Sequence, residues 1–496
     1  MFHKVTTLTF RKISTHYHRS TPQLINKSLP CLSQKRNFAK TLFERMNERV
    51  PEMQERTKQI MAQAKDKKLS DVTVSQAAGG MRGVKALICD TSLLDINEGI
   101  RFRGLTLPEV EKKLPTGKCR GATKSEYPLP EAMLWLLLTG EVPTPEETAQ
   151  LSEQLTTEPY NSVPKHARQI IDDLPVHQHP MSQYITGVMA LQTESKFAEA
   201  YQNGVNRAKY WKYALDDTLN LVAKIPMISA RIYRQTFRDG VVKSGDESLD
   251  WSANWTKMCG LTKDGNDEIS DLMRMYFFIH TDHEGGNVSA HATHLVGSAL
   301  SDPYLSYTAG MCGLAGPLHG LANQESLRFI QKIQRLLGDK KPTKEFIHKF
   351  VIDLLESGQV VPGFGHAVLR VTDPRYTIQR EFAMKYLNNS DMFKIVDLLF
   401  QVAPPILKDW KGGKIANPWP NLDAHSGCLL HEYGIKEDSF YTVLFGMSRA
   451  IGVLSNYVID RALSAPIERP KSITFDWIND NYCDPKIPDP PVMPQK

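Results

Sequence analysis

Residues 343–358 read TKEFIHKFVIDLLESG, and the spacing of their apolar side chains indicates the fold class. The apolar residues recur in pairs separated by three or four positions, as on one face of an α-helix: Phe346, Ile347, Phe350, Val351, Leu354 and Leu355. Thr343 precedes the run and Gly358 stops it, which are start and stop signals of a helix. The stretch therefore predicts a helix that buries one face.

The same periodicity recurs along the chain, whereas strand-like alternation is scarce. One helical pattern follows Gly320 and ends at Gly338, and another runs over residues 439–459. Alternation is limited to short pieces near residues 87–89 and 100–102. We therefore predict an all-α protein.

Length and composition set broad limits on the protein. A chain of 496 residues exceeds the usual size of a single core, so two domains are expected. Hydrophobic content of 41% and charged content of 23% are ordinary for a soluble globular protein. The seven cysteines include no C-x-x-C pair, which indicates a reduced compartment and neither a disulfide framework nor a cysteine zinc site.

The N-terminal 43 residues are basic and contain no acid. They hold eight Lys or Arg within a Ser/Thr-rich segment, which is the composition of a mitochondrial transit peptide. The alternative is a basic arm for nucleic acid, but no basic cluster occurs elsewhere. Arg36-Asn37-Phe38 resembles a matrix-protease site, and cleavage there changes the net charge from +5 to −2. We predict a presequence over residues 1–38.

The segment 439–459 carries a single charged residue, Arg449. A charge in the middle of the segment argues against a membrane span and favours a core helix with a buried guanidinium. Such a group needs an anion, either an internal carboxylate or a ligand. The sequence leaves both open.

Four short segments rich in glycine or proline each surround ionisable side chains: residues 283–287, 313–320, 362–366 and 420–427. An all-helical enzyme can build a site in this way, because rigid helices form the frame and glycine-rich ends let backbone and imidazole approach a ligand.

Two of these segments suit carbon-acid chemistry. His319 precedes a predicted helix, whose N-terminus would keep the imidazole neutral and able to donate to an enolate oxygen. Asp423 in a partly dry loop is a competent general base for a carbon acid. The plainer alternatives are a histidine that caps the helix and an aspartate that stabilises a turn.

The other two segments resemble known motifs only in part. His283-Glu284 begins like H-E-x-x-H, but the fifth residue is Asn287 and two glycines would break the required helix. His283 is better assigned as a donor to a substrate oxygen, with a metal site shared with His291 and His294 as the alternative to simple packing.

Gly363-Phe364-Gly365-His366 lacks the third glycine of a dinucleotide motif, since Val368 stands there. Backbone contact with a nucleotide-like ligand is compatible with the segment. Arg370 and Arg375, which follow, suit phosphate or carboxylate groups.

In their order and spacing these segments resemble the citrate synthase family, most closely its mitochondrial eukaryotic type. The motifs are DHEGGN (282–287), GPLHG (316–320), GHAVLR (365–370) and NPWPN (417–421), and the resemblance covers about residues 81–472. It implies an all-α fold with a large domain (39–320 and 435–496), a small domain (321–434), and a cleft between them that closes on substrate.

The resemblance also implies the residue roles. Asp423 would take the methyl proton of acetyl-CoA, His319 would hold the enol oxygen, and His366 would polarise the oxaloacetate carbonyl, before citryl-CoA is hydrolysed to citrate and CoA. The implied oxaloacetate and citrate ligands are His283, Arg375, Arg449 and Arg469. The implied CoA ligands are Val360, Val361, Gly363, Phe364, Arg370, Lys414, Asn421 and Arg207. Phe364 and Val371 stand where relatives often have Tyr and Lys, which could trim CoA contacts.

As the family implies, we expect a matrix enzyme that is a homodimer, with Arg469 and Arg207 contributed across subunits. We expect no cofactor besides its CoA substrate, no metal, no nucleic acid and no membrane span. One alternative is 2-methylcitrate synthase, which uses propionyl-CoA on the same scaffold. Another is a structural, filament-forming protein of this fold, against which the intact ionisable positions argue.

Overall fold

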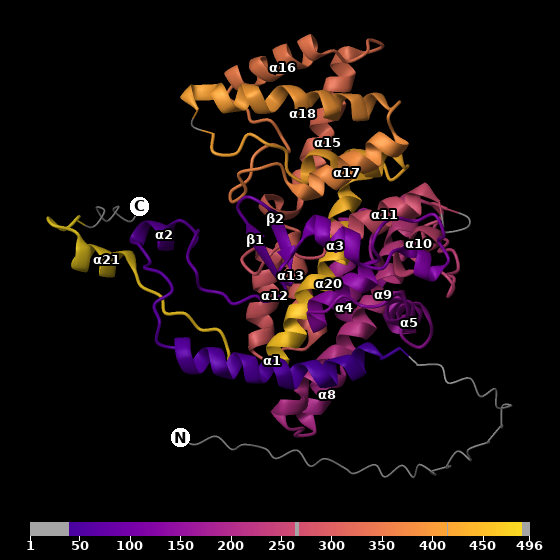
Figure 1. The fold of residues 1–496 in the computed structure, drawn as a ribbon, viewed down its shortest axis with the longest axis vertical. Helices are drawn as coiled ribbons and strands as arrows, with labels where there is room; N and C mark the ends of the chain where they lie inside the picture. The colour runs from indigo at the N-terminus through magenta and orange to yellow at the C-terminus, as the bar shows by residue number, and fades with distance from the viewer. Residues whose placement is uncertain (1–38, 263–266, 414, 489–496) are drawn as a thin grey trace, which may run out of the picture. The chain divides into compact units, whose positions relative to one another are not determined.

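Helices dominate the structure, a computed structural model that describes residues 39–262, 267–413 and 415–488 (Figure 1). The described residues form twenty-one α-helices, five short 3-10 helices and one small sheet. The predicted all-α class is confirmed. The predicted presequence, residues 1–38, lies outside the described residues.

Sixteen α-helices belong to the two segments expected to form a large domain. They are α1 (Leu42–Ala64), α2 (Val74–Ala78), α3 (Leu107–Lys113), α4 (Pro130–Thr139), α5 (Pro145–Thr156), α6 (Lys165–Asp173), α7 (Pro180–Met189), α8 (Lys196–Gln202), α9 (Tyr210–Phe237), α10 (Trp251–Met258), α11 (Glu268–Ile279), α12 (Val288–Ser298), α13 (Pro303–Leu314), α14 (Pro317–Gly320), α20 (Tyr441–Ala462) and α21 (Phe475–Tyr482).

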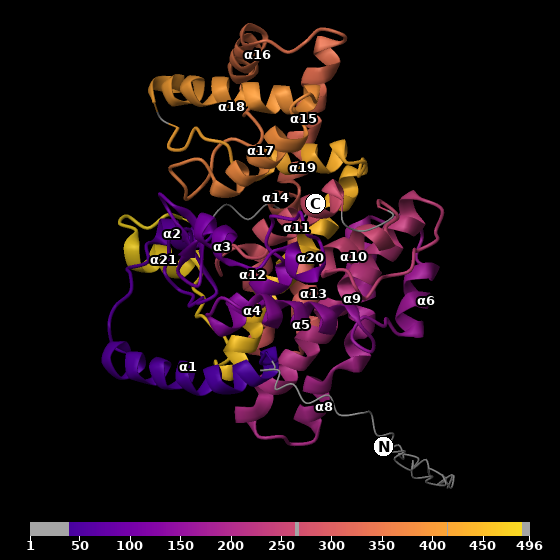
Figure 2. The ribbon, with the colours of Figure 1, turned by 45° about the vertical axis from the view of Figure 1, so that its right-hand side comes forward.

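The other five α-helices pack mainly on one another and lie together at the top of Figures 1 and 2. They are α15 (Ala322–Leu337), α16 (Lys344–Glu356), α17 (Pro374–Tyr386), α18 (Asp391–Asp409) and α19 (Asp423–Glu432). The helix predicted from residues 343–358 is α16, and the Thr343 side chain caps it by accepting from the Phe346 amide at 3.2 Å. The pattern that ends at Gly338 is α15.

The small sheet corrects one prediction. Strands β1 (Ser92–Asp95), β2 (Gly99–Phe102) and β3 (Leu105–Thr106) are antiparallel neighbours in that order. The predicted piece at 100–102 lies in β2, but residues 87–89 are not a strand. The prediction there was wrong because apolar alternation alone cannot supply a strand partner, and β2 pairs instead with residues 92–95.

Helix α20 runs through the core between α4, α9, α12 and α13 (Figure 2). Within the described part of the chain, Asp438–Ala462 is the one helical segment long and apolar enough to cross a membrane, but 89% of its most apolar window is buried inside the structure. The segment predicted from residues 439–459 is therefore a core helix, as expected. It holds Arg449 at its middle. The other site residues come from the loop after α11, from α14, from the segment before α17, and from the first turns of α17 and α19.

Candidate active site

The loop between α11 and α12 fixes His283. The buried Asp282 carboxylate accepts hydrogen bonds from Thr91 Oγ1 (2.7 Å), Ser92 Oγ (2.8 Å) and the His283 amide (3.0 Å). Asn287 caps α12 and donates from Nδ2 to the His283 carbonyl at 3.0 Å. The backbone of His283 is thereby held, while the buried ring nitrogen Nε2 has no hydrogen-bond partner among the described residues. Burial, and after it the charge of Arg375, lowers the pKa of His283 well below its usual value.

His319 stands at the end of α14 with its ring against the first turn of α12. The Ser289 amide donates to His319 Nε2 at 3.2 Å, and Ser289 Oγ lies 3.0 Å from the same nitrogen. An amide can only donate, so Nε2 accepts and the ring hydrogen is on Nδ1. Burial, followed by the charge of Arg449, lowers the pKa of His319 to about 4. The expected neutral donor is present, but it faces the N-terminus of α12, not that of the helix which follows it in the chain.

His366 has the opposite tautomer. Its Nδ1 accepts from the amides of Val368 (3.0 Å) and Leu369 (3.1 Å), which leaves the hydrogen on Nε2. The ring centroid lies 5.7 Å from that of His283. Burial, and then Arg375, lowers the pKa of His366, so this ring is a second neutral donor.

Two of the three predicted substrate arginines, Arg375 and Arg449, differ in their surroundings. Arg375, in the first turn of α17, donates to both oxygens of buried Asp373, from Nε at 3.0 Å and from Nη2 at 2.7 Å. Arg449 is 1% exposed, lies 4.9 Å from the centroid of the Phe445 ring, and has no partner at Nε or Nη1. Burial lowers the pKa of Arg449 to about 10. Within the described residues no ion pair reaches it, so of the two alternatives left open by the sequence the structure favours a ligand anion.

Asp423 is the first residue of α19, and its backbone amide donates to Asn421 Oδ1 at 2.9 Å. No described residue hydrogen-bonds or ion-pairs with its carboxylate. Burial raises the pKa of Asp423 to about 6, against the opposing effect of Arg375 and with a smaller contribution from Asp373. The group is therefore ionised at neutral pH and still basic enough to take a proton.

These side chains lie close enough for the charge of one to change the pKa of another. Arg375 perturbs the pKa values of His283, His366 and Asp423 alike. His283 is further perturbed by His319 and by Arg449. The structure thus brings together the six side chains predicted to act on the reacting groups: His283, His319, His366, Arg375, Asp423 and Arg449.

The predicted CoA segment is joined to the Asp423 loop. The amide of Gly365 donates to the Trp419 carbonyl and that of Asn421 to the Gly363 carbonyl, both at 2.9 Å. Asn421 Nδ2 also donates to the Gly365 carbonyl at 2.9 Å. At Gly363, where φ is +79°, a Cβ would come within 2.5 Å of the Ala424 backbone. Only glycine allows this contact, so the segment and the base are positioned as one unit.

The remaining predicted CoA and substrate residues are less constrained. Val361 is buried and Val360 exposed, beside half-buried Phe364. Exposed Arg370 donates to the carbonyls of Val368 and Leu369 at 2.8 Å each. Lys414 lies outside the described residues.

The two arginines expected to act across subunits lie near the segment that follows α20. Arg207 donates to the carbonyls of Ser464 (3.2 Å) and Ala465 (3.0 Å), and Arg469 is exposed a few residues further on.

His291 and His294 are not merely packed. His291 Nε2 lies 2.9 Å from Glu468 Oε1, and His294 Nδ1 lies 2.8 Å from Asp460 Oδ2. That hydrogen bond raises the pKa of His294. Among the described residues no three His, Cys, Asp or Glu side chains converge as metal ligands, so the structure gives the alternative of a histidine metal site no support.

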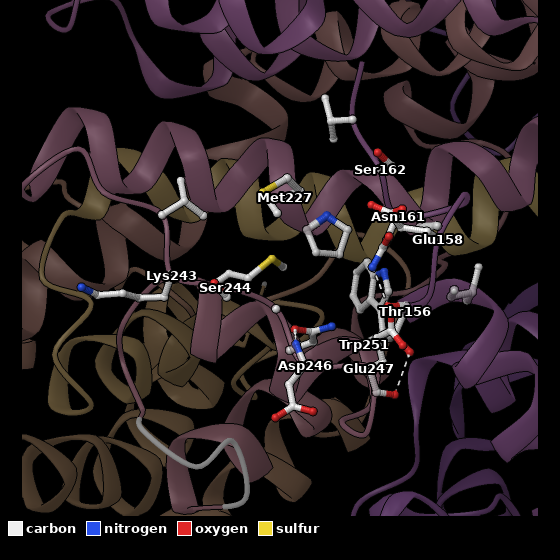
Figure 3. Close-up of a pocket in the computed structure, with 18 of the residues that line it drawn as sticks. Thr156, Glu158, Asn161, Ser162, Met227, Lys243, Ser244, Asp246, Glu247 and Trp251 are labelled. Carbon is white, nitrogen blue, oxygen red and sulfur yellow. Dashed lines mark hydrogen bonds between the residues drawn. The ribbon is translucent and has the colours of Figure 1, made fainter. Parts of the chain in front are cut away.

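A cavity of about 410 Å³ lies away from these residues, between α5, α9, α10 and the segment 242–247 (Figure 3). Its charged lining is of both signs, and the charges are partly paired: Asp246 holds Lys257 at 2.6 Å, and Arg231 pairs with Asp172. No predicted site residue lines it. Its mixed, internally compensated lining does not match the histidines and arginines described above.

Four residues that hold the site were not predicted from the sequence: Thr91, Ser92, Ser289 and Asp373. Asp373-Pro374 was visible as a helix start, and Ser289 follows the cap Asn287 by two residues. Thr91 and Ser92 carried no signal, because their partner lies about 190 positions away in the sequence.

Comparison with known proteins agrees with the site. The family model described as "Citrate synthase, C-terminal domain" matches residues 80–471. The chain is 52% identical over 431 residues to "Probable citrate synthase, mitochondrial" of Glossina morsitans morsitans, covering 87% of this chain and 90% of the relative. It is 51% identical over 436 residues to "2-methylcitrate synthase, mitochondrial" of Yarrowia lipolytica, covering 88% and 91%.

A solved structure is similar as well. The citrate synthase from Pyrobaculum aerophilum superposes with a TM-score of 0.68 at 26% identity, covering 79% of this chain and 91% of that one. The mitochondrial names of the relatives confirm the predicted mitochondrial location.

Proposed function

The chain belongs to the citrate synthase family, and we propose that the site described above condenses acetyl-CoA with oxaloacetate and hydrolyses citryl-CoA to citrate and CoA. The observation that carries this proposal is the combination of one unpaired carboxylate, Asp423, with two neutral imidazoles whose free N–H groups are fixed by backbone amides.

Each residue then has one task in the first step. The Asp423 carboxylate removes a proton from the thioester methyl group, while His319 Nδ1–H donates to the carbonyl oxygen that becomes the enol oxygen. The nucleophilic carbon attacks the oxaloacetate carbonyl, and His366 Nε2–H stabilises the oxygen on which charge develops. Neutral donors suit both positions, because the low pKa values of the rings keep them from charging at neutral pH.

Arg375 and Arg449 bind the substrate carboxylates, and His283 donates to a substrate oxygen. The unpartnered donors of Arg449 support this assignment, since a buried guanidinium gains most from an anion that it meets directly. We further propose that Arg469 of a second subunit binds oxaloacetate and citrate, and that Arg207 of a second subunit binds CoA. Arg370, Lys414, Asn421 and the segment 360–364 complete the CoA set.

We propose that α15–α19 (321–434) are a small domain that closes over the cleft. Asp423 lies on this group and His319 on the other, so closure would complete the site only around bound substrate and exclude water.

We propose a homodimer formed through the outer face of α12–α14. Val288, Leu295 and Leu318 are exposed there, and Leu318 is 104% exposed. Exposed apolar residues grouped beside a site favour an interface between subunits. Sedimentation of Leu318→Asp should show a lower mass than wild type; an unchanged mass would exclude this face.

The test of the function is a thiol-release assay with acetyl-CoA and oxaloacetate. In Asp423→Asn we expect kcat to fall about a thousandfold with oxaloacetate binding retained, because only the base is removed. Asp391→Asn, which changes an exposed acid in the first turn of α18, is the matched control and should keep full activity. Activity in Asp423→Asn within tenfold of wild type would exclude Asp423 as the base.

The relative from Yarrowia lipolytica supports a second candidate substrate, propionyl-CoA, because its identity of 51% is nearly that of the citrate-forming relative. One extra methylene changes kcat/KM by about 10- to 200-fold in an apolar pocket. Comparing kcat/KM for acetyl-CoA and propionyl-CoA decides between them.

A further inference from the structure

Asp282 is a buried carboxylate next to the substrate residue His283, with no task in the mechanism above. Its three hydrogen-bond donors are two hydroxyls and one amide, and all lie within 3.0 Å. No Lys or Arg of the described residues lies within 4 Å of it. Three donors satisfy the oxygens of this carboxylate, so it is held in the core by hydrogen bonds and not by a direct ion pair.

Helix α20 lies directly against this carboxylate. The Gly452 amide is 3.2 Å from the Thr281 carbonyl, and a Cβ at Gly452 would come within 2.5 Å of Asp282 Cβ. Arg449 precedes Gly452 by three residues and therefore shares its face of the helix. Because Gly452 has no side chain, Asp282 can lie against the same side of α20 as Arg449.

Arg449 and Asp282 interact electrostatically but do not touch. Asp282 is the acid whose charge favours the protonated guanidinium, whereas Arg375 opposes it. The Arg449 donors Nε and Nη1 stay unpartnered. Arg375 differs, because Asp373 occupies its Nε and Nη2 directly.

We propose that Asp282 is a positioning residue for the dicarboxylate substrate: held by Thr91 and Ser92, it fixes the His283 loop and compensates the charge of Arg449 from a distance, which leaves the guanidinium donors available to a substrate carboxylate. The inference rests on the proposed function, since it concerns the same oxaloacetate. A carboxylate in direct contact with Arg449 would compete with the substrate for the guanidinium donors. Asp282 makes no hydrogen bond to these donors and therefore leaves them to the substrate.

The competing explanation is that Asp282 only fastens β1 to the core. Asp217 on α9 provides the matched control, because it is equally buried and also accepts three hydrogen bonds, from Ser195 Oγ (2.8 Å) and the amides of Lys196 (2.9 Å) and Phe197 (3.0 Å). No arginine in the described part of the chain pairs with it. Burial raises the pKa of Asp217 to about 7, so the comparison is made at pH 8, where this carboxyl is largely ionised and Asp217→Asn removes a buried, hydrogen-bonded carboxylate away from the site.

The experiment measures oxaloacetate binding to the purified full protein by calorimetry, together with both KM values. We expect Asp282→Asn to weaken oxaloacetate binding at least about tenfold while the KM for acetyl-CoA is unchanged, and Asp217→Asn to alter neither. In an Arg449→Gln background the effect of Asp282→Asn should be smaller than in wild type, because the part that acts through Arg449 is lost and only the part that acts through the His283 loop remains. The alkaline limb of the oxaloacetate KM profile should move to lower pH in Asp282→Asn.

Each result has a distinct meaning. If wild type does not bind oxaloacetate, the proposed function fails. If wild type binds and Asp282→Asn binds within twofold of it, the inference fails. If Asp282→Asn does not fold, Thr91→Val and Ser92→Ala, which each remove one donor, replace it: weaker oxaloacetate binding supports the inference, and unchanged binding overturns it.

Discussion

Two buried arginines, Arg274 and Arg449, are each 1% exposed, and the difference between them separates structure from function. Arg274 on α11 donates to Asp250 at 2.7 Å and to Asp271 at 2.8 Å. Arg449 on α20 has two donors without a partner. Although burial alone would lower it, the two aspartates raise the pKa of Arg274, whereas burial lowers that of Arg449 to about 10.

The Arg274 cluster stabilises the fold because every member has a further partner. Asp250 caps α10 through the amides of Ser252 (3.1 Å) and Ala253 (3.0 Å), and Ser125 Oγ donates to Asp271 at 2.6 Å. In the active site, by contrast, His283 Nε2 and the Arg449 atoms Nε and Nη1 are buried without a hydrogen-bond partner among the described residues. Such groups cost stability, and the cost is tolerated where a ligand will meet them.

The largest effect is expected from breaking the paired cluster. Arg274→Gln leaves two buried carboxylates without their cation, so the free energy of unfolding should fall by about 3–5 kcal/mol. Denaturant unfolding measures it, and the fraction that remains folded should show wild-type KM for oxaloacetate. A stability loss below about 1 kcal/mol would mean that the pairing is not what holds α10 to α11.

The next largest effect is expected at the unpaired Arg449, where substitution should lower activity and leave stability intact. Arg449→Gln should lower kcat/KM for oxaloacetate about a hundredfold or more, because a charged contact made by the substrate is lost. Its unfolding free energy should equal or exceed that of wild type, since a buried charge without a direct ion pair is removed. Steady-state kinetics and denaturant unfolding of the same preparation test both parts, and a strong loss of stability would contradict the comparison.

Much of this could be predicted from the sequence where the signal is local. The periodicity of α15, α16 and α20 was readable because helical contacts lie three and four residues apart, and glycine-rich segments marked the loops of His283, His319 and His366. The sequence could not decide whether Arg449 has an internal partner. It also could not show that His319 faces α12, or that Thr91 and Ser92 hold Asp282, because these contacts join positions 30 to about 190 residues apart.

Lowering the pH by one unit below pH 6 is expected to reduce kcat about tenfold. Burial raises the pKa of Asp423 to about 6, so the carboxylate that acts as base is protonated below that pH. At saturating substrates kcat should therefore be near its maximum at pH 7 and above, and fall about tenfold per unit below pH 6. His319, with its pKa of about 4, is neutral throughout this range. An acid limb near pH 4 instead would mean that Asp423 is not the group that titrates.

A half-buried acid that faces a like charge, Glu111, extends the comparison from the two arginines to a pair of carboxylates. Glu111 on α3 and Glu381 on α17 line one cavity, in which Glu98 is paired with Arg101. The nearby lysines are committed elsewhere: Lys113 pairs with Glu109 and Lys385 with Glu126. Burial, and then the charge of Glu381, raises the pKa of Glu111 to about 7.

The smallest effect is expected at this pair. Between about pH 4.5 and 7 the folded protein keeps a proton on Glu111 that the unfolded chain has released, so this residue's contribution to stability falls as pH rises through that window. Glu111→Gln should therefore raise Tm by about 1 °C at pH 8 and leave it unchanged at pH 4.5, since Glu111 is only half-buried and solvent screens the repulsion. Glu356→Gln, at an exposed end of α16, should change neither value. An equal rise in Tm at both pH values would mean that Glu111→Gln stabilises the protein through packing and not through charge. Within this comparison, only the unpaired charges of the active site would then lower stability through charge alone.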